Sequence, residues 1–201
     1  MKKKVLLLGS GGHAKSCLDI ILSLGLEVKI LCEKKNVKKK IMNKIVSLDY
    51  SFLTEDKIKN FKILIGIGHI KNPNIRINLY KKLKILNANF LLLKSKTANI
   101  SKFSSIKKGT FIGQNVIVNA DTEIGYNCII NNKALIEHDV KIGNHVHVST
   151  GAIINGGVKI GSGSFIGSGS IIFNNITIGK NCVVGAGQIL KKSIKDNTTV
   201  K

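Results

Sequence analysis

The sequence predicts an α/β domain over residues 1–92 followed by a parallel β-helix over residues 93–201. Three observations support this prediction. In the first part, short apolar runs alternate with helix-length segments, and a glycine-rich turn directly follows the first apolar run. In the second part, an aliphatic residue recurs at every sixth position. Most of the 20 glycines also lie in the second part, so the two parts are built differently.

The first part is expected to form a parallel sheet with covering helices. The expected elements are, in chain order, a strand over Lys2–Leu8, a helix near Ala14–Leu24, a strand over Glu27–Cys32, a strand over Lys62–Ile67 and a helix over Asn74–Leu86. Strands that alternate with helices in this way favour an α/β unit. We interpret the lysine-rich stretch Lys34–Lys44 as a solvated loop.

The turn after the first strand has the composition of a nucleotide-binding turn. Gly9, Gly11 and Ala14 fit the pattern Gly-x-Gly-x-x-Gly/Ala, and Glu33 follows at about the distance of a ribose-binding acid. Glycines let the backbone approach a phosphate at a helix N-terminus, where the helix dipole favours an anion. Only one mononucleotide half is present, which argues against a complete NAD site and favours a small Rossmann-like domain for another nucleotide. His13 either contacts the ligand or makes a local hydrogen bond at the helix start.

The second part repeats every six residues. All sixteen residues in the main register are aliphatic, and neither a helical nor an alternating period explains this over such a length. The register consists of Ile100, Ile106, Ile112, Val118, Ile124, Ile130, Ile136, Ile142, Val148, Ile154, Ile160, Ile166, Ile172, Ile178, Val184 and Leu190. Four positions later stands a small or β-branched residue, as at Thr110 and Cys128. The position just after the aliphatic residue is often glycine or asparagine, as at Gly113 and Asn119, which we interpret as turn residues tolerant of positive φ.

Each hexapeptide is interpreted as a short strand and a turn, and three of them close a triangular coil. Residues 100–195 then give between five and six coils, stacked about 4.8 Å apart by backbone hydrogen bonds. Cys128 and Cys182 lie 54 residues apart, which is three whole coils. We therefore interpret both as core residues rather than as catalytic or metal-binding thiols.

Composition excludes several partners. The net charge is +21, but Arg76 is the only arginine, and no aromatic residues interleave with the lysines as stacking platforms. We expect no nucleic-acid partner, although the lysines would attract phosphorylated ligands. The four cysteines form no Cys-x-x-Cys pair, and the apolar run Val5–Leu8 is too short for a signal peptide or a membrane span. The sequence therefore predicts a cytoplasmic protein without a membrane partner.

Three of the five histidines, His138, His145 and His147, lie within ten residues of one another. His138 stands between two acids, Glu137 and Asp139, at a turn where a side chain points outward. Imidazole suits the removal of a proton from a reacting amine or hydroxyl near neutral pH, and the adjacent carboxylate would raise its basicity and fix its tautomer. One alternative is a surface histidine on a turn. The other is a metal site formed by the three histidines, whose spacing fits no zinc signature.

The spacing of His138 and His147 predicts an oligomer. They are nine residues apart, which is half of an eighteen-residue coil, so in one subunit they lie on opposite sides. If both line one pocket, they come from neighbouring subunits, and a trimer supplies three such grooves.

Several motifs together carry a family resemblance. They are Gly9–His13, Gly66–Gly68 with Arg76, the Ser95–Ser101 junction, Ile136–Asp139 and His145–Ser149. In this combination the chain resembles the sialic acid O-acetyltransferase family of hexapeptide-repeat acyltransferases, which includes bacterial UDP-4-amino-sugar N-acetyltransferases. The resemblance implies a left-handed β-helix, a homotrimer, acetyl-CoA as co-substrate and no metal.

The resemblance also implies roles for individual residues. His138 would be the general base, and Asp139 would tune it. The acetyl-CoA site would include His147, Ser168 and Ala186. The implied sugar-nucleotide site consists of Gly11, Gly12, His13, Cys32, Glu33 and Gly68. The chain departs from the family at two places, because Cys32 and Glu33 stand where relatives carry paired acids, and the terminal Thr198–Lys201 lacks a Gly-x-Pro-Ala loop.

The predicted function is acetyl-CoA-dependent N-acetylation of a UDP-linked 4-amino sugar for surface glycan synthesis. O-acetylation of sialic acid or a related nonulosonic sugar is the nearest alternative, since the sequence does not separate an amine from a hydroxyl acceptor. A non-catalytic trimeric scaffold that binds a sugar nucleotide is the alternative from another class.

Overall fold

The computed structural model describes residues 4–201, which form two compact units. The first unit comprises the residues up to Gly68 together with Asn74–Leu93. The second comprises His69–Pro73 together with Lys94–Lys201.

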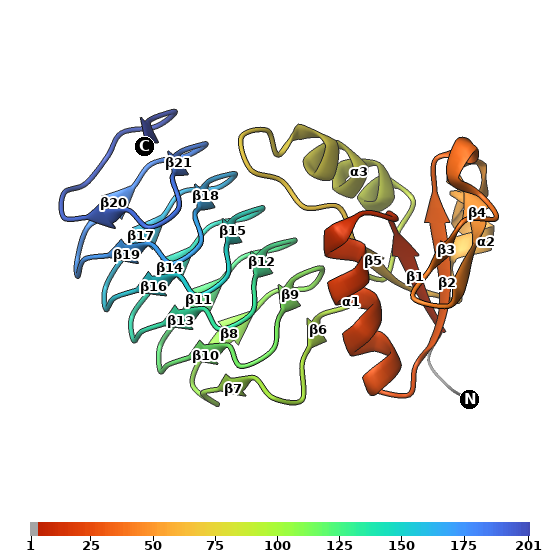
Figure 1. The fold of residues 1–201 in the computed structure, drawn as a ribbon, viewed down its shortest axis with the longest axis horizontal. Coiled ribbons are helices and arrows are strands. Elements are labelled where there is room, and N and C mark those ends of the chain that lie inside the picture. Colours follow the sequence, from red (N-terminus) through yellow and green to blue (C-terminus); the bar gives the residue numbers. More distant parts are fainter. Residues whose placement is uncertain (1–3) are drawn as a thin grey trace. The chain divides into compact units, whose positions relative to one another are not determined.

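A five-stranded sheet in the order β3–β4–β2–β1–β5 runs through the first unit (Figure 1). Its strands are β1 (Lys4–Leu8), β2 (Glu27–Cys32), β3 (Lys40–Ile41), β4 (Lys44–Asp49) and β5 (Lys62–Ile65). The helices of this unit are α1 (Gly12–Ser23), the single-turn α2 (Glu55–Ile58) and α3 (Asn74–Ile85), with 3-10 turns η1 (Lys34–Asn36) and η2 (Tyr50–Phe52). β1 pairs in parallel with both β2 and β5, while β3 runs antiparallel to β4. This is the α/β arrangement that the sequence predicted.

Both faces of β1, an interior strand of this sheet, are covered. Val5 to Leu8 are all fully buried, as expected for a parallel strand with helices on both sides. Leu6 and Leu8 belong to an apolar cluster that includes Leu83 of α3. Leu7 faces the opposite side, where a side chain on Gly66 would contact both Leu7 and Ala14 of α1. The close packing of α1 on the sheet therefore depends on a glycine at the end of β5.

Some element boundaries differ from those expected. The first strand was expected to begin at Lys2, but Lys2 and Lys3 lie outside the described residues, and β1 is described from Lys4. The stretch Lys34–Lys44, expected to be a loop, contains η1 and the hairpin formed by β3 and β4. Met42 and Asn43 both have positive φ, 45° and 63°, which suits a two-residue hairpin turn. The hairpin was not predicted because the segment is rich in lysine and has no apolar pattern typical of strands. Only Ile41 in β3 and Val46 in β4 are buried.

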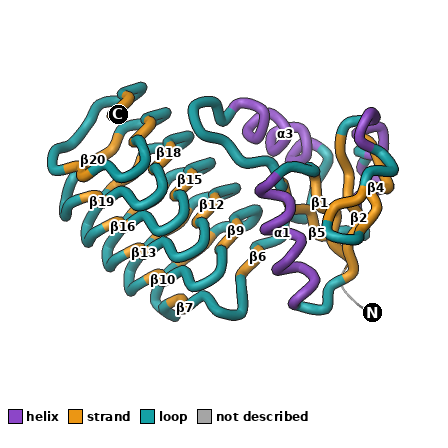
Figure 2. Tube along the Cα trace, viewed as in Figure 1, coloured by secondary structure: helices purple, strands orange, loops and turns teal. Residues whose placement is uncertain are grey.

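The second unit is a parallel β-helix of two-residue strands (Figure 2). The strands are β6 (Leu93–Lys94), β7 (Asn99–Ile100), β8 (Ser105–Ile106), β9 (Phe111–Ile112), β10 (Ile117–Val118), β11 (Glu123–Ile124), β12 (Ile129–Ile130), β13 (Leu135–Ile136), β14 (Lys141–Ile142), β15 (His147–Val148), β16 (Ile153–Ile154), β17 (Lys159–Ile160), β18 (Phe165–Ile166), β19 (Ile171–Ile172), β20 (Thr177–Ile178), β21 (Val183–Val184), β22 (Ile189–Leu190) and β23 (Thr199–Val200). Every strand from β7 to β22 ends on one of the sixteen aliphatic residues of the repeat. The hexapeptide therefore sets the strand positions as predicted.

The register of the β-helix is eighteen residues. From β7 to β22, strands that lie three apart in the chain pair with each other, so that Ile117 lies beside Leu135 and Leu135 beside Ile153. The last coil is two residues shorter, and there β21 pairs with β23. Three sheets result, with the orders β22–β19–β16–β13–β10–β7, β20–β17–β14–β11–β8 and β23–β21–β18–β15–β12–β9–β6. The aliphatic residues point inward and are buried, except that Ile100 and Ile106 in the first coil are half-buried.

Small residues fill the corners of the coils, four positions after each aliphatic residue. Thr110 is fully buried, and its hydroxyl donates to the carbonyl of Gly125 at 2.9 Å. Cys128 and Cys182 are also fully buried, and their thiols lie 3.1 Å and 3.0 Å from backbone carbonyls of the following coil. This confirms that both cysteines are core residues.

The expectation that the glycines just after the aliphatic residues have positive φ was wrong. Positive φ occurs three positions after the aliphatic residue, at every sixth residue from Gly109 to Gly187, and not at the next position, where we expected it. The glycines at that next position have another role, since an added Cβ would collide with the following coil. For Gly161 the Cβ would lie 2.5 Å from backbone atoms of Gly179 and Lys180. Glycine is thus needed here for close approach between coils rather than for its φ angle.

No helix within residues 4–201 is long and apolar enough to span a membrane.

Arg76, the only arginine, stabilises the end of β5. Its side chain is 1% exposed, and its guanidinium donates to the carbonyls of Ile65 and Ile67. Arg76→Met should lower the free energy of unfolding by about 2 kcal/mol or more, because two buried carbonyls lose their donor. Lys81→Met, on an exposed position of the same helix, should change it by less than about 0.5 kcal/mol. Chemical denaturation measures both, and equal effects would show that the Arg76 contacts do not contribute.

Candidate functional site

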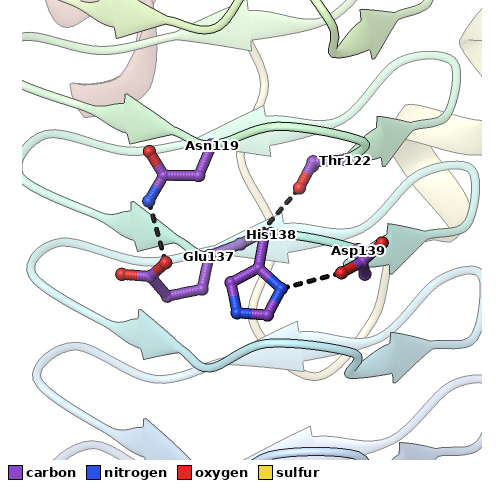
Figure 3. A network of polar contacts seen from close by, with 5 residues as sticks. All are labelled: Asn119, Thr122, Glu137, His138 and Asp139. Atoms are coloured by element: carbon purple, nitrogen blue, oxygen red, sulfur yellow. Dashed lines mark hydrogen bonds and ion pairs between the residues drawn. The ribbon is translucent and has the colours of Figure 1, made fainter.

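His138 and Asp139 form a hydrogen-bonded pair on a corner of the β-helix (Figure 3). They lie in the turn between β13 and β14, directly after the buried Ile136. Nδ1 of His138 is 2.7 Å from a carboxylate oxygen of Asp139, and both side chains are more than half exposed. Asp139 occupies the position of positive φ in its hexapeptide, with φ 59°, a conformation that aspartate tolerates better than most residues.

The carboxylate of Asp139 determines how His138 can act. An ionised carboxylate only accepts hydrogen bonds, so the neutral imidazole carries its proton on Nδ1 and leaves Nε2 free of a proton. The hydrogen bond to Asp139 raises the pKa of His138, partial burial opposes this, and the charges of Asp139 and Glu137 raise it further. The arrangement gives a more basic imidazole with a fixed tautomer, as a general base requires.

Contacts to both neighbouring coils hold the backbone of this turn. The Thr122 hydroxyl donates to the carbonyl of Glu137 at 2.7 Å, and the amide of Asp139 donates to the carbonyl of Ala120. On the other side, the amide of Gly157 donates to the carbonyl of His138 at 3.0 Å. The amide group of Asn119 also donates to the Glu137 carboxylate at 2.8 Å (Figure 3). The position of His138 is therefore set by the stacking of the coils.

A second feature is a pocket of about 410 Å³ on the sheet that contains β15, β18 and β21. Its lining consists of Ile70, Lys71, His147, Ser149, Phe165, Gly167, Ser168, Val183, Gly185, Ala186, Thr199, Val200 and Lys201. The lining includes all three predicted coenzyme residues, His147, Ser168 and Ala186. It is mainly apolar, with lysines at Lys71 and Lys201.

His147 is held firmly in this pocket. It is 8% exposed, and its Nδ1 donates to the carbonyl of His69 at 2.7 Å. Its ring meets those of His69 and Phe165 edge to face, with centroids 5.5 Å and 5.1 Å apart. The segment His69–Pro73 belongs to this unit, whereas we had placed it in the first domain. Its residues Ile70 and Lys71 line the pocket, and no pattern in the sequence indicated this.

The three clustered histidines do not converge. His138 lies at the turn after β13, and the pocket lining that includes His147 does not include His138. His145 lies at another turn, where its Nδ1 is 2.9 Å from the side-chain amide of Asn127. Within the described chain, no three His, Cys, Asp or Glu side chains come together as metal ligands.

In the first unit, the predicted sugar-nucleotide residues lie at the carboxyl ends of neighbouring parallel strands. Gly11 is the N-cap of α1 without a side-chain cap, and an added Cβ on Gly11 or Gly12 would meet open space. Gly68 lies against His13, since a Cβ there would be 3.5 Å from the Cβ of His13. Nε2 of His13 is 3.6 Å from the thiol of Cys17. The glycine turn thus presents backbone at a helix N-terminus, a suitable place for a phosphate.

Cys32, the last residue of β2, and Glu33, which follows it, differ in exposure. Cys32 is 2% exposed, and burial raises the pKa of its thiol, which donates to the carbonyl of Glu33 at 3.3 Å. Glu33 is exposed and pairs with Lys35 at 2.9 Å. Burial also raises the pKa of the Cys17 thiol, to about 12. Neither cysteine is thus prepared to act as a nucleophile.

Three protein families match parts of the chain. The PglD N-terminal domain matches residues 4–83, the bacterial transferase hexapeptide (six repeats) matches residues 139–174, and the hexapeptide repeat of succinyl-transferase matches residues 157–192. No curated protein matches the chain in sequence.

Solved structures of acetyltransferases share the fold over almost the whole chain. PerB from Caulobacter crescentus, in complex with CoA and GDP-perosamine, is 25% identical, with a TM-score of 0.89 over 98% of this chain and 92% of that chain. The acetyltransferase domain of PglB from Neisseria gonorrhoeae FA1090 is 25% identical, with a TM-score of 0.89 over 98% and 96%. A mutant of the perosamine N-acetyltransferase from Caulobacter crescentus, with the same ligands, is 24% identical, with a TM-score of 0.90 over 98% and 92%.

These similarities and the repeat geometry define the fold. The chain has the fold of the solved acetyltransferases, with an N-terminal α/β domain and a left-handed parallel β-helix of hexapeptide repeats. The predicted fold class is confirmed. Of the expected family resemblance, the part that these matches support is the similarity to sugar N-acetyltransferases.

The pKa of His138 provides a direct test of the pair. Asp139→Asn removes the carboxylate that accepts from Nδ1, so we expect the pKa of His138 to fall. Titration of the ring by NMR measures this. Asp121→Asn is the matched control, because Asp121 occupies the equivalent turn position one coil earlier, with φ 57°, and should leave the pKa unchanged. A pKa that stays constant in Asp139→Asn would contradict the assigned hydrogen bond.

Proposed function

We propose that this protein transfers the acetyl group of acetyl-CoA to the amine of a nucleotide-linked amino sugar, with His138 as general base. The observation that carries the proposal is the His138–Asp139 pair, which leaves Nε2 as a proton acceptor on an exposed corner of an acyltransferase β-helix. The acetyl-CoA and sugar-nucleotide complexes of the similar structures support the choice of both substrates. A 4-amino sugar is the acceptor we favour, linked to UDP or GDP, for surface glycan synthesis in the cytoplasm.

His138 has two tasks in the proposed reaction. Nε2 accepts a proton from the sugar amine while the amine nitrogen attacks the thioester carbonyl carbon. When the tetrahedral intermediate breaks its C–S bond, the imidazolium returns the proton to the leaving sulfur. An amide and a free thiol result, and His138 is again neutral. Asp139 stabilises the imidazolium formed between the two steps, through the bond at Nδ1.

The pocket around His147 has the chemistry that a coenzyme A arm requires. Phe165 and Val183 offer an apolar wall for the pantetheine chain, while Lys71 and Lys201 offer positive charge to its phosphates. His147, Ser168 and Ala186 are the coenzyme-contacting residues in this proposal. The sugar nucleotide is assigned to Gly11, Gly12, His13, Cys32, Glu33 and Gly68, where the uncapped N-terminus of α1 suits a phosphate.

A homotrimer is part of the proposal, because His138 and the His147 pocket are on different parts of one chain. One outer face of the β-helix has the composition of a contact surface between subunits. The first residues of five strands form an apolar ladder along it, namely Ile117, Leu135, Ile153, Ile171 and Ile189. The corresponding ladder on another sheet is Ser105, Glu123, Lys141, Lys159 and Thr177, which suits solvent.

The acceptor is tested by release of free thiol from acetyl-CoA. The panel contains UDP- and GDP-linked 4-amino sugars, sialic acid and the non-acetylatable parent nucleotides. We expect release with an amino sugar nucleotide, and His138→Ala should lower the rate about 100-fold or more. His145→Asn, which suits the positive φ of that turn, should retain activity.

Other results on the panel would replace the proposal. Release with sialic acid alone would favour O-acetylation. Tight binding of a sugar nucleotide without any release, unchanged in His138→Asn, would favour the non-catalytic scaffold.

The apolar ladder gives a prediction about assembly. Ile153→Glu places a charge in the middle of the ladder, so we expect the trimer to dissociate into monomers that still fold, because Ile153 points away from the core. Lys159→Glu introduces the same residue at the equivalent strand position of the polar face and should leave the trimer intact. Sedimentation velocity distinguishes these states. A trimeric Ile153→Glu protein would show that the ladder is not the contact surface.

A further inference from the structure

Gly156 occupies the space beside the His138 ring in the next coil. The two residues are eighteen positions apart, and Gly156 is buried. An ideal Cβ added to Gly156 would lie 2.6 Å from Cε1, 2.7 Å from Nε2 and 3.2 Å from Nδ1 of His138. All three distances are shorter than a carbon makes in ordinary van der Waals contact, so the ring and any side chain at position 156 exclude each other.

The requirement for glycine here comes from the imidazole and not from the backbone. Gly156 does not have the positive φ that its neighbour Gly157 has, so the backbone at 156 accepts an ordinary residue. The repeat glycine Gly125 differs, since its added Cβ would meet backbone atoms of the next coil, with the carbonyl oxygen of Gly143 at 2.6 Å. The nearest atoms to an added Cβ at 156 all belong to the His138 ring.

We infer that Gly156 is a positioning residue for the proposed base: its missing side chain leaves the space in which the His138 ring lies bonded to Asp139. This inference rests on the proposed function for its effect on catalysis, but the position of the ring does not depend on that function. Without the space, the ring has to turn, because hydrogen bonds from Asp139 to Ala120 and from Gly157 to His138 hold the backbone on both sides. A turned ring moves Nδ1 away from the Asp139 carboxylate and shifts Nε2, the proton acceptor of the proposed reaction.

Gly156→Ala is the direct test. We expect the NMR-measured pKa of His138 to fall in the same direction as in Asp139→Asn, because the hydrogen bond to Asp139 is lost. In the acetyl-transfer assay we expect kcat to fall about 100-fold and KM for both substrates to change little, since a misplaced base affects the reaction step rather than binding. The acid limb of the pH–rate profile should move to lower pH together with the pKa.

Gly151→Ala is the matched control. Gly151 lies in the turn before β16, and nothing lies within 4 Å of its added Cβ, but its φ of 66° makes alanine strained. We expect this control to lose stability while the pKa of His138 and kcat stay unchanged. A Gly156→Ala protein that folds with an unaltered pKa for His138 would overturn the inference, as would an equal fall in the pKa in Gly151→Ala.

A double-mutant cycle covers the case in which Gly156→Ala folds poorly. Removing the ring frees the space, so Gly156→Ala should lower Tm in the wild-type background and have little effect in a His138→Ala background. An equal loss of Tm in both backgrounds would overturn the inference. The proposed function can fail without this inference failing. If the wild-type protein transfers no acetyl group, the pKa and Tm measurements still show whether Gly156 positions the His138 ring.

Discussion

The stacking of backbone hydrogen bonds at a fixed interval of eighteen residues is the constraint on which the rest of the β-helix depends. The amide of Ile117 bonds to the carbonyl of Ala134 and the amide of Leu135 to that of Ala152, and the same step recurs along all three sheets until the last coil, where it is sixteen residues. Because three hexapeptides make one coil, residues eighteen apart must share a position around the axis.

The same interval determines where chemistry can occur. The aliphatic position faces inward, and the residue before it faces outward, so the three outer faces differ freely in composition. One face carries an isoleucine-rich ladder, another carries charges, and the third carries His147 and its pocket. The corners provide the remaining exposed positions, and His138 is at one of them beside Asp139. A residue in the next coil, Gly156, then becomes the neighbour of His138 although it is eighteen residues away.

Much of this architecture could be predicted from the sequence, because the six-residue repeat of aliphatic residues determines where each strand of the β-helix lies. The strand positions from Ile100 to Leu190 follow from the repeat, and the outward position of His138 follows from its place two residues after Ile136. The family resemblance assigned His147, Ser168 and Ala186 to the coenzyme, and all three line one pocket.

Other features depend on three-dimensional contacts that no local pattern encodes. The hairpin of β3 and β4 was missed because lysines dominate its sequence. The contribution of Ile70 and Lys71 to the pocket arises from a segment outside the repeat. The repeat glycines were assigned to the wrong cause, since Gly161 is required by contact with the next coil and not by its φ angle. In the last two cases the reason lies in a neighbour far away in the sequence.

In the proposed function, His138 of one copy of the chain acts together with the His147 pocket of another copy. The most direct test mixes His138→Ala and His147→Ala proteins, unfolds and refolds them together, and measures acetyl transfer by the mixed trimers. With random assembly at equal amounts, about a quarter of wild-type activity should return, because each mixed trimer has one groove with both histidines intact. Mixed trimers verified by native mass spectrometry that show no more activity than the separate variants would contradict the account.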